Sequence, residues 1–327
     1  MKILIIRLSS IGDIILTTPV IKAFKEKYPD SQIDFLVLSK FEEAISGNPL
    51  INKIYLFDKE KNDGYNKIKE FAKELKEQKY DYVFDLHNKF RSQIITKNIG
   101  TKTYTYKKRK IWKSLLVKLH LIKYKVDNTI IKNYFDAFKD FDLNYKGENL
   151  DFFFRNSDLE RVKNYKNYGV ISPGASKNTK KWPASYYGEL AKKLFEKYGK
   201  PILIIGGKED IESARIISEI AGNSVIDFTG QLSLKESGAL LSQSKFLICN
   251  DSAPFHIGRS YNIITFVIFG PTSPEMFEFN KNDNLIFEGE VCSPCSLHGD
   301  KCCPKGHFNC MKNIKPEFIF EKIILKI

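Results

Sequence analysis

The amino-acid sequence predicts an α/β protein built from two similar halves, each a parallel sheet with helices between its strands. Short, almost continuous apolar runs alternate with amphipathic helical patterns, which is typical of strands buried on both faces of a doubly wound sheet. The alternation stops in a polar, turn-rich stretch at 144–167 and then starts again. The 327 residues suffice for two domains with cores of their own. We therefore expect domains at 1–155 and 156–327.

The first half begins with an apolar run over residues 2–8, a turn of small residues, and apolar positions at helical spacing from Asp13 onward. Asp13 thus lies between the carboxyl end of a buried strand and the amino end of a helix, where open α/β sheets bind ligands. The alternative role for this carboxylate is a helix cap. Because Ser9 and Ser10 are also able to cap the helix, we favour a chemical role for Asp13.

Polar residues also follow the last strand of the first half. Strand-like runs occur at 32–38, 53–57 and 80–87, with a charged helical segment at 65–78. The run at 80–87 ends at the sheet edge where ligands are expected. We predict that His87 and Arg91 contact an acceptor there, although a single histidine at a strand end more often has a structural role.

The second half repeats the pattern, with strands expected at 169–172, 202–206, 224–228, 245–249 and 263–269 and helices at 184–198, 210–221 and 234–242. Three loops after strands suit a nucleotide. Residues 172–183 offer hydroxyls, lysines and backbone N–H groups to a diphosphate. Glu209 and Asp210 stand where an acidic side chain either accepts from ribose hydroxyls or caps a helix. Residues 250–252 lead into a helix start, which favours an anion.

These stretches together resemble glycosyltransferase family 9, the bacterial lipopolysaccharide heptosyltransferases. The residues that carry the resemblance are S-S-I-G-D at 9–13 with T-T-P at 17–19, P-G-A with K-K-W-P at 173–183, N-D-S-A-P-F-H at 250–256 and G-P-T-S-P at 270–274. The resemblance covers nearly the whole chain and implies two Rossmann-like domains facing a central cleft, the GT-B type. It also implies an inverting transfer of heptose from ADP-heptose to a lipopolysaccharide core acceptor of the Kdo or heptose type, with no cofactor required for catalysis.

The resemblance assigns roles to particular residues. Asp13 is implied as the general base that deprotonates the acceptor hydroxyl. Together with the loops described above, it places the donor against Ser176, Lys180, Glu209, Asp251, Ser252, Ala253 and His256. At Ala253 the sequence departs from the family, which usually has glycine there, so an added methyl group could crowd the diphosphate. His87 and Arg91 match a similar polar stretch on the acceptor side.

Cysteine is concentrated near the end of the chain, where five of the six cysteines lie within 292–310. A C-x-x-C pair followed by further cysteines, in a chain expected to be cytoplasmic, indicates zinc more readily than disulfides. We predict a structural zinc site at Cys292, Cys295, Cys303 and Cys310, with Cys302 as the alternative to Cys303 and with His298 and His307 as spare ligands. Thiols that only pack a loop, or a redox pair, are the other interpretations.

The charge of the chain is +13, from 52 basic and 39 acidic residues. The densest basic stretch, 102–125, indicates an anionic glycolipid acceptor or peripheral contact with the inner membrane surface, unless it is only a solvated face. Few of the basic residues are arginine, so we predict no nucleic-acid partner. No apolar run is long enough to span a membrane, and we expect a cytoplasmic protein. The alternatives are a GT-B enzyme on another nucleotide sugar, including an epimerase, and a non-enzymatic protein that binds anionic polymers or membranes.

Overall fold

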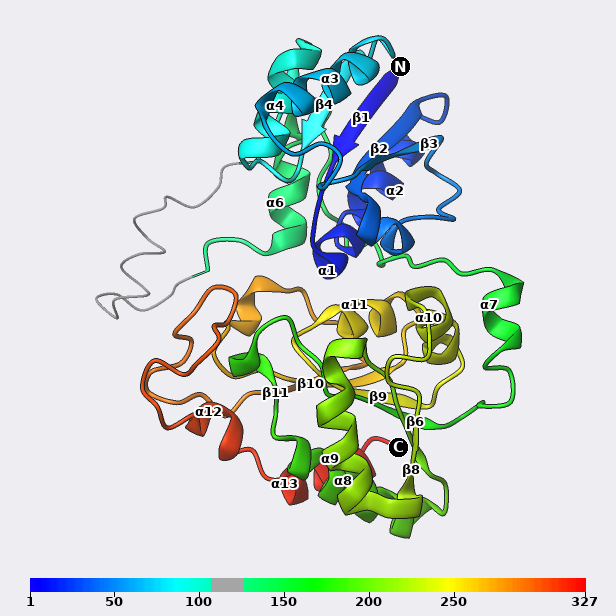
Figure 1. Cartoon of the computed structure of the whole chain (residues 1–327), viewed down its shortest axis with the longest axis vertical. Helices are drawn as coiled ribbons and strands as arrows, with labels where there is room; N and C mark the ends of the chain where they lie inside the picture. The colour runs from blue at the N-terminus through cyan, green and yellow to red at the C-terminus, as the bar shows by residue number, and fades with distance from the viewer. Residues whose placement is uncertain (107–125) are drawn as a thin grey trace. The chain divides into compact units, whose positions relative to one another are not determined.

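The chain folds into two compact α/β units (Figure 1). The computed structural model describes residues 1–106 and 126–327. Of the described residues, the first unit holds 1–106 and 128–153, and the second holds 126–127 and 154–327. Most of the basic stretch predicted to meet an anionic partner, residues 107–125, lies outside the described residues. Two units built on parallel sheets confirm the predicted fold class.

The first unit contains a five-stranded sheet in the order β3-β2-β1-β4-β5, and all neighbouring strands are parallel. The strands are β1 (Lys2–Ile6), β2 (Gln32–Leu38), β3 (Lys53–Phe57), β4 (Tyr82–Asp85) and β5 (Thr103–Tyr104). Strand β1 is central and its residues after Lys2 are buried, as its apolar run predicts. Strands β2 and β3 lie on one side of β1, and the chain then crosses to place β4 and β5 on the other side, as in a Rossmann fold.

Helices cover both faces of this sheet. They are α1 (Ile11–Ile15), α2 (Thr18–Lys27), α3 (Tyr65–Lys76), α4 (Phe90–Ile99) and α6 (Ile130–Asp136). Helices α3 and α4 pack on one face over an aliphatic core that includes Leu4, Ile6 and Leu75. Helices α2 and α6 contact each other, and an aromatic cluster that includes Phe24, Phe84 and Phe138 builds a second part of the core.

The helix expected to run on from Asp13 is instead two helices, α1 and α2. Pro19 has no N–H to donate to the carbonyl of Ile15, so the helical ladder cannot continue through it. The hydroxyl of Thr18 donates to that carbonyl at 2.8 Å, and the hydroxyl of Thr17 donates to the carbonyl of Ile14 at 2.7 Å. The helical spacing of apolar residues was therefore correct, but the proline divides the segment.

The second unit contains a six-stranded parallel sheet in the order β11-β10-β9-β6-β7-β8. The strands are β6 (Gly169–Ser172), β7 (Ile202–Ile204), β8 (Val225–Asp227), β9 (Phe246–Asn250), β10 (Ile264–Ile268) and β11 (Asp283–Ile286). The first five were predicted to within two residues at either end, and β11 was not predicted. Its sequence, D-N-L-I, has only two apolar residues and does not resemble a buried strand.

The helices of the second unit are α7 (Asn156–Glu160), α8 (Ala184–Tyr198), α9 (Ile211–Ala221), α10 (Leu234–Ser242), α11 (Ala253–Ser260), α12 (Asn309–Lys312) and α13 (Pro316–Ile324). Helices α8, α9 and α13 bury apolar side chains against the sheet, with Trp182, Tyr187 and Leu190 in the same core cluster. Helix α11 packs against β9 and β10, and α10 packs against α11.

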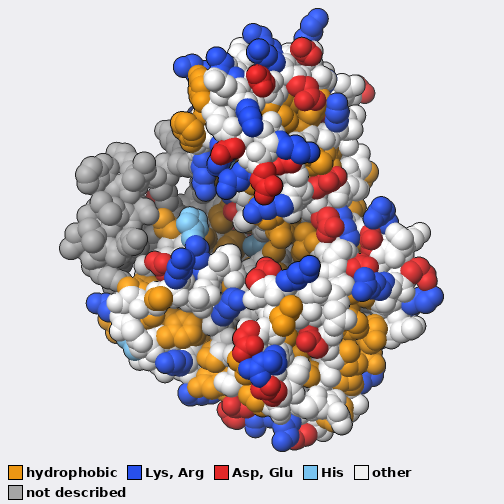
Figure 2. All heavy atoms as spheres, in the orientation of Figure 1, with side chains coloured by type: hydrophobic (Ala, Val, Ile, Leu, Met, Phe, Trp, Pro, Cys, Tyr) orange, Lys and Arg blue, Asp and Glu red, His pale blue; other side chains and the backbone are white. Residues whose placement is uncertain are grey.

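Among the described residues, no helix combines the length and the apolar character needed to cross a lipid bilayer. On the face drawn in Figure 2, Lys and Arg side chains are spread among Asp and Glu side chains. The basic side chains on that face therefore do not form a single patch.

Candidate functional site

The predicted site residues follow the strands at which each sheet reverses its order. In the first sheet this point lies between β1 and β4, and in the second between β6 and β9. Loops beyond the carboxyl ends of such strand pairs form the ligand-binding crevice of open α/β sheets. Asp13 and His87 follow β1 and β4, and residues 173–180 and 251–252 follow β6 and β9. Each unit thus has its candidate residues at its own switch point.

The Asp13 carboxylate lies in the short helix α1 and forms an ion pair with Arg7. Arg7 Nη2 is 2.9 Å from Asp13 Oδ2. The same oxygen accepts hydrogen bonds from the backbone N–H of Ser10 at 3.1 Å and from its hydroxyl at 2.8 Å. Asp13 therefore does take part in capping α1, and the expectation that the serines would relieve it of this role was wrong. About 29% of the Asp13 side chain stays exposed, so the carboxylate remains reachable by a ligand.

These contacts set the protonation state of Asp13. Partial burial acts to raise its pKa, but the charge of Arg7 and the hydrogen bonds from Ser10 outweigh burial and lower the pKa to about 2. The carboxylate is therefore ionised throughout the neutral range. It is also a weaker base than an unpaired aspartate for as long as Arg7 holds it.

The Arg7 side chain was not recognised in the sequence as part of the site. Its Nη1 donates to the carbonyl of Leu86 at 2.6 Å, which ties the end of β1 to the segment after β4. Its guanidinium also lies 5.5 Å from the ring centroid of Tyr134 on α6. A buried arginine at the end of an apolar run was the available signal, because such a charge needs a partner.

His87 and Arg91 occupy different environments. The His87 side chain is buried, and its backbone N–H donates to Asp85 Oδ1 at 3.0 Å, which closes the turn after β4. Arg91 lies in the first turn of α4, and its Nη2 is 4.0 Å from Asp63 in a largely exposed pair. The role of both residues in holding an acceptor remains a prediction.

In the second unit, the loop after β6 delivers Lys180 to a buried carboxylate. Lys180 Nζ lies 2.7 Å from Asp251 Oδ2, and the two side chains are 11% and 6% exposed. The hydroxyl of Thr272 donates to the same carboxylate oxygen at 2.8 Å. Asp251 thus fixes the position of the Lys180 ammonium group. Sequence motifs identified the residues but could not show that they pair.

Asn250 fastens the loop after β6 to the end of β9. Its Oδ1 accepts from the backbone N–H of Trp182 at 3.0 Å and from the hydroxyl of Tyr187 at 3.1 Å, and its Nδ2 donates to the carbonyl of Pro173 at 2.7 Å. The side chain is fully buried. A buried amide with all of these partners rigidifies its surroundings. The candidate phosphate loop is therefore held at both of its ends.

Glu209 and Asp210, which the sequence does not separate, differ clearly in the structure. Asp210 is buried, pairs with Lys181 Nζ at 3.0 Å and accepts from the backbone N–H of Gly207 at 3.2 Å. A Cβ on Gly174 would lie 2.1 Å from Asp210 Oδ2, which explains glycine at that position. Glu209 is exposed. Asp210 is thus structural, and Glu209 is the carboxylate available to a ligand.

The remaining donor residues lie around the start of α11 and in the loop after β6. Ser176 is exposed. Ser252 is the N-cap of α11, and its hydroxyl donates to the carbonyl of Asn250 at 3.3 Å. Ala253 is the first residue of α11 and is half-buried. The buried His256 ring packs 5.2 Å from that of Phe277. Of these side chains, only Ser176 and Ser252 present accessible hydroxyls close to the helix terminus or the loop.

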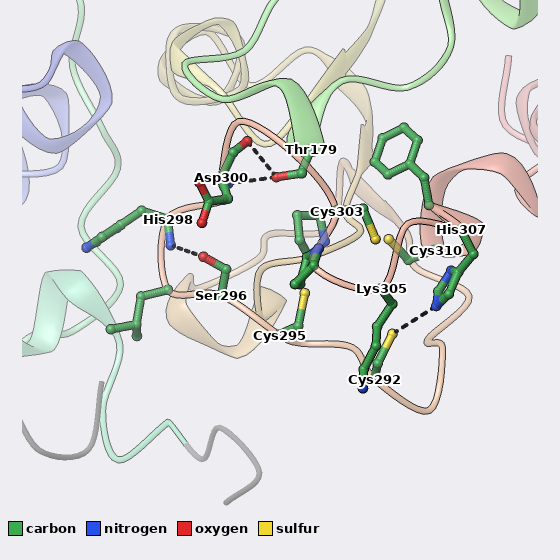
Figure 3. Close-up of a pocket in the computed structure, with 15 residues that line it drawn as sticks. Thr179, Cys292, Cys295, Ser296, His298, Asp300, Cys303, Lys305, His307 and Cys310 are labelled. Atoms are coloured by element: carbon green, nitrogen blue, oxygen red, sulfur yellow. Dashed lines mark hydrogen bonds between the residues drawn. The ribbon is translucent and has the colours of Figure 1, made fainter. Parts of the chain in front are cut away.

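The four cysteines predicted to bind zinc line one cavity of about 260 Å³ (Figure 3). Cys302 is exposed and is not among the lining residues, so only Cys303 of that pair lies at the cavity. Burial raises the pKa of the Cys295 thiol to about 11 and that of Cys310 to about 12, which does not suit a reactive redox pair. Within the described residues, no three His, Cys, Asp or Glu side chains already form a cluster that could hold a metal.

Comparison with known proteins shows the family. The model of glycosyltransferase family 9 (heptosyltransferase) matches residues 68–305. Lipooligosaccharide heptosyltransferase 2 of Campylobacter jejuni is 31% identical, over 99% of this chain and 98% of its own. A solved family 9 glycosyltransferase from Veillonella parvula covers 100% of this chain and 98% of its own, with 20% identity and a TM-score of 0.82. Escherichia coli heptosyltransferase WaaC, solved with ADP-2-deoxy-2-fluoro heptose, covers both chains completely, with 17% identity and a TM-score of 0.71. The chain belongs to glycosyltransferase family 9, the heptosyltransferase family, and is a glycosyltransferase.

Proposed function

We propose that the protein transfers heptose from ADP-heptose to a lipopolysaccharide core acceptor of the Kdo or heptose type, with inversion at the anomeric carbon. The curated relatives are named lipooligosaccharide or lipopolysaccharide heptosyltransferases, and a solved neighbour was crystallised with an ADP-heptose analogue. The observation that carries the proposal is the Lys180 ammonium group, fixed by Asp251 beside a helix start at a Rossmann switch point. A fixed cation at such a position suits the diphosphate of a nucleotide sugar.

In the proposed reaction, Asp13 removes the proton from the acceptor hydroxyl as that oxygen attacks the anomeric carbon of heptose. The new glycosidic C–O bond forms while the bond between the anomeric carbon and the diphosphate oxygen breaks, and ADP carries away the electron pair. Attack from the face opposite the diphosphate inverts the configuration. The low pKa of Asp13 keeps the carboxylate ready to accept a proton at neutral pH.

The charge that develops on ADP is met by the second unit. Lys180 supplies a positive charge, Ser176 and Ser252 supply hydroxyl donors, and the start of α11 supplies backbone N–H groups and the positive end of a helix dipole. Glu209 is the acceptor for the ribose hydroxyls. In this scheme catalysis needs no cofactor, and a metal at the cysteines is structural.

The acceptor is proposed to bind in the first unit, with His87 and Arg91 as contacts. A core acceptor is an anionic glycolipid, and Arg91 keeps a substantial part of its side chain exposed for an anionic group. The excess of positive charge favours peripheral contact with an anionic membrane surface, which we place at the inner face of the cytoplasmic membrane.

The choice of donor is tested by thermal unfolding of the protein with ADP, UDP, GDP or CMP. A ligand that binds only the folded state raises the unfolding midpoint. We expect ADP to raise the midpoint more than the other three nucleotides at equal concentration. A larger shift with UDP or GDP would keep the family but contradict ADP-heptose as the donor.

A further inference from the structure

The cysteine cavity lies in the long irregular segment at residues 287–308, between β11 and α12. Within this segment the described structure has no helix or strand, so side chains and turns must hold it in place. Cys292, Cys295 and Cys303 come from it, and Cys310 comes from α12. All four are free thiols that line the same cavity. A segment of this kind gains most from an internal cross-link.

A zinc ion fits this donor set better than disulfides do. Four thiols that line one cavity supply the number and type of ligands that structural zinc sites use. Because the described side chains do not yet form a metal-holding cluster, binding would draw the thiols together within the cavity. The cavity gives them room for that movement.

His307 is arranged as a hydrogen-bond donor to one of these sulfurs. Its Nδ1 accepts from the backbone N–H of Asn309 at 3.0 Å, so the ring proton of the neutral imidazole is on Nε2. That Nε2 lies 3.8 Å from Cys292 Sγ. A ring N–H that donates to a cysteine sulfur is typical of the surroundings of metal ligands. His307 is therefore a supporting donor and not the spare ligand expected from the sequence.

The same segment holds the loop that carries Lys180. The backbone N–H and the hydroxyl of Thr179 contact the carbonyl of Asp300 at 3.2 and 3.1 Å, and the backbone N–H of Asp300 donates to the Thr179 hydroxyl at 2.7 Å (Figure 3). Gly299 packs on the Lys180 stem so closely that a Cβ there would lie 2.7 Å from Lys180 Cγ. Gly299 and Asp300 lie between Cys295 and Cys303, so ligands on both sides of them would anchor this contact.

We propose that Cys292, Cys295, Cys303 and Cys310 bind a zinc ion that clamps residues 299–300 onto Thr179 and Lys180, so that zinc occupancy sets the affinity for the donor diphosphate. The clamp rests on the proposed function of Lys180. The metal site itself does not, because it stands on the cysteines alone.

The test measures the zinc content of the full chain, zinc affinity by competition with a chromophoric chelator, and ADP affinity by calorimetry. The variants are Cys303→Ser, its neighbour Cys302→Ser as the matched control, and Thr179→Val, which removes both hydrogen bonds between the Thr179 hydroxyl and Asp300 without touching a thiol. We expect one zinc per chain in the wild type, in Cys302→Ser and in Thr179→Val, and loss of zinc in Cys303→Ser. ADP binding should weaken about tenfold in Cys303→Ser and Thr179→Val.

Chelation of the wild-type protein provides a check that needs no variant to fold. Removing zinc should weaken ADP binding, and adding zinc back should restore it. No zinc uptake by the reduced chain, iron in place of zinc, a disulfide among the four cysteines, or equal zinc loss in Cys302→Ser would overturn the zinc site. Zinc binding with unchanged ADP affinity in Thr179→Val would overturn the clamp. Failure of every nucleotide to bind, even with zinc present, would contradict both the donor assignment and the clamp. The zinc stoichiometry would still test the metal site independently.

Discussion

At the scale of single residues, Asp13 has two roles with opposite requirements: it stabilises the turn after β1 and it is the proposed general base. Its ion pair with Arg7 and its bonds to Ser10 order the turn after β1, but they also lower its basicity. A general base works best when its pKa lies near the working pH. We infer that an acceptor that competes for the Arg7 guanidinium would raise the pKa of Asp13 as the reaction begins.

The substitution Asp13→Asn tests the role of this carboxylate as base. Asparagine can still accept from the backbone N–H of Ser10, so α1 should form and ADP should still raise the unfolding midpoint. Turnover should fall by about 10²- to 10⁴-fold, because a positioned base contributes that much. The exposed Asp30→Asn is a matched control. Turnover of Asp13→Asn within a few-fold of wild type would contradict the assignment of the base.

The substitution Arg7→Met tests the cause of the low pKa. Without the guanidinium, the strongest of the effects that lower the pKa of Asp13 is gone, so this pKa should rise from about 2. The acid limb of kcat/KM that belongs to Asp13 should then move into the measurable range, whereas Arg7→Lys should leave it near that of the wild type. An unchanged acid side in Arg7→Met would show that Arg7 does not tune the base.

The lowered pKa of Asp13 also makes the stability of the fold depend on pH. Because the pKa of Asp13 is lower in the folded chain than in the unfolded chain, the ion pair stabilises the fold above about pH 4 and this contribution is lost as the pH falls toward 2. The midpoint difference between wild type and Asp13→Asn should shrink over that range.

At the scale of elements, the ends of β6 and β9 act as one assembly. The Asn250 side chain on β9 forms hydrogen bonds with Pro173 and Trp182 in the loop after β6 and with Tyr187 on α8. These partners are far from Asn250 in the sequence. Lys180 and Asp251 bring the same two strand ends together a second time. The position of the donor lysine therefore depends on a buried polar network and not on the loop sequence alone.

The substitution Asn250→Ala should destabilise the second unit strongly. It leaves the N–H of Trp182, the hydroxyl of Tyr187 and the carbonyl of Pro173 without this partner, at a cost of about 1–3 kcal/mol for each group that stays buried and unsatisfied. Denaturant unfolding measures the loss. A change below about 0.5 kcal/mol, typical of a surface substitution, would contradict the account of this network.

A double substitution is needed to test Lys180 as a diphosphate ligand, because its side chain is paired with Asp251. Lys180→Met alone removes the ammonium partner of a buried carboxylate and should cost about 3–5 kcal/mol of stability, which would obscure any effect on binding. Lys180→Met combined with Asp251→Asn removes both charges, so stability should recover while the midpoint shift caused by ADP disappears. A double variant that keeps the full ADP shift would exclude Lys180 as a diphosphate ligand.

Several elements were predictable because local patterns determine them. The bounds of β2, β3, β6, α8 and α10 agree with the sequence prediction, since buried strands and amphipathic helices have distinct periods. Strand order was not predictable from periodicity, and it is strand order that places β1 beside β4 and β6 beside β9. The pairs Arg7 with Asp13 and Lys180 with Asp251, and the contact of Thr179 with Asp300, depend on three-dimensional proximity. Motifs named three of these residues, Asp13, Lys180 and Asp251, but none of the pairings.

At the scale of the whole molecule, each unit brings a different part of the proposed reaction. The first supplies the base and the acceptor contacts, and the second supplies a fixed cation, a helix start and the cysteine segment. Lipooligosaccharide heptosyltransferase 2 of Campylobacter jejuni matches nearly the full length of the chain, so the similarity extends over both units. The diffuse positive charge suits a glycolipid acceptor at a membrane surface better than base-specific contacts with nucleic acid.

The central claim is heptosyl transfer from ADP-heptose, and the product itself tests it most directly. The protein is incubated with ADP-heptose and a Kdo-bearing core acceptor, and the product is followed by mass spectrometry and by NMR of its anomeric proton. We expect release of ADP, an acceptor heavier by one heptose, and an anomeric configuration opposite to that of the donor. Turnover only with a different nucleotide sugar, or a product that retains the donor configuration, would contradict the account.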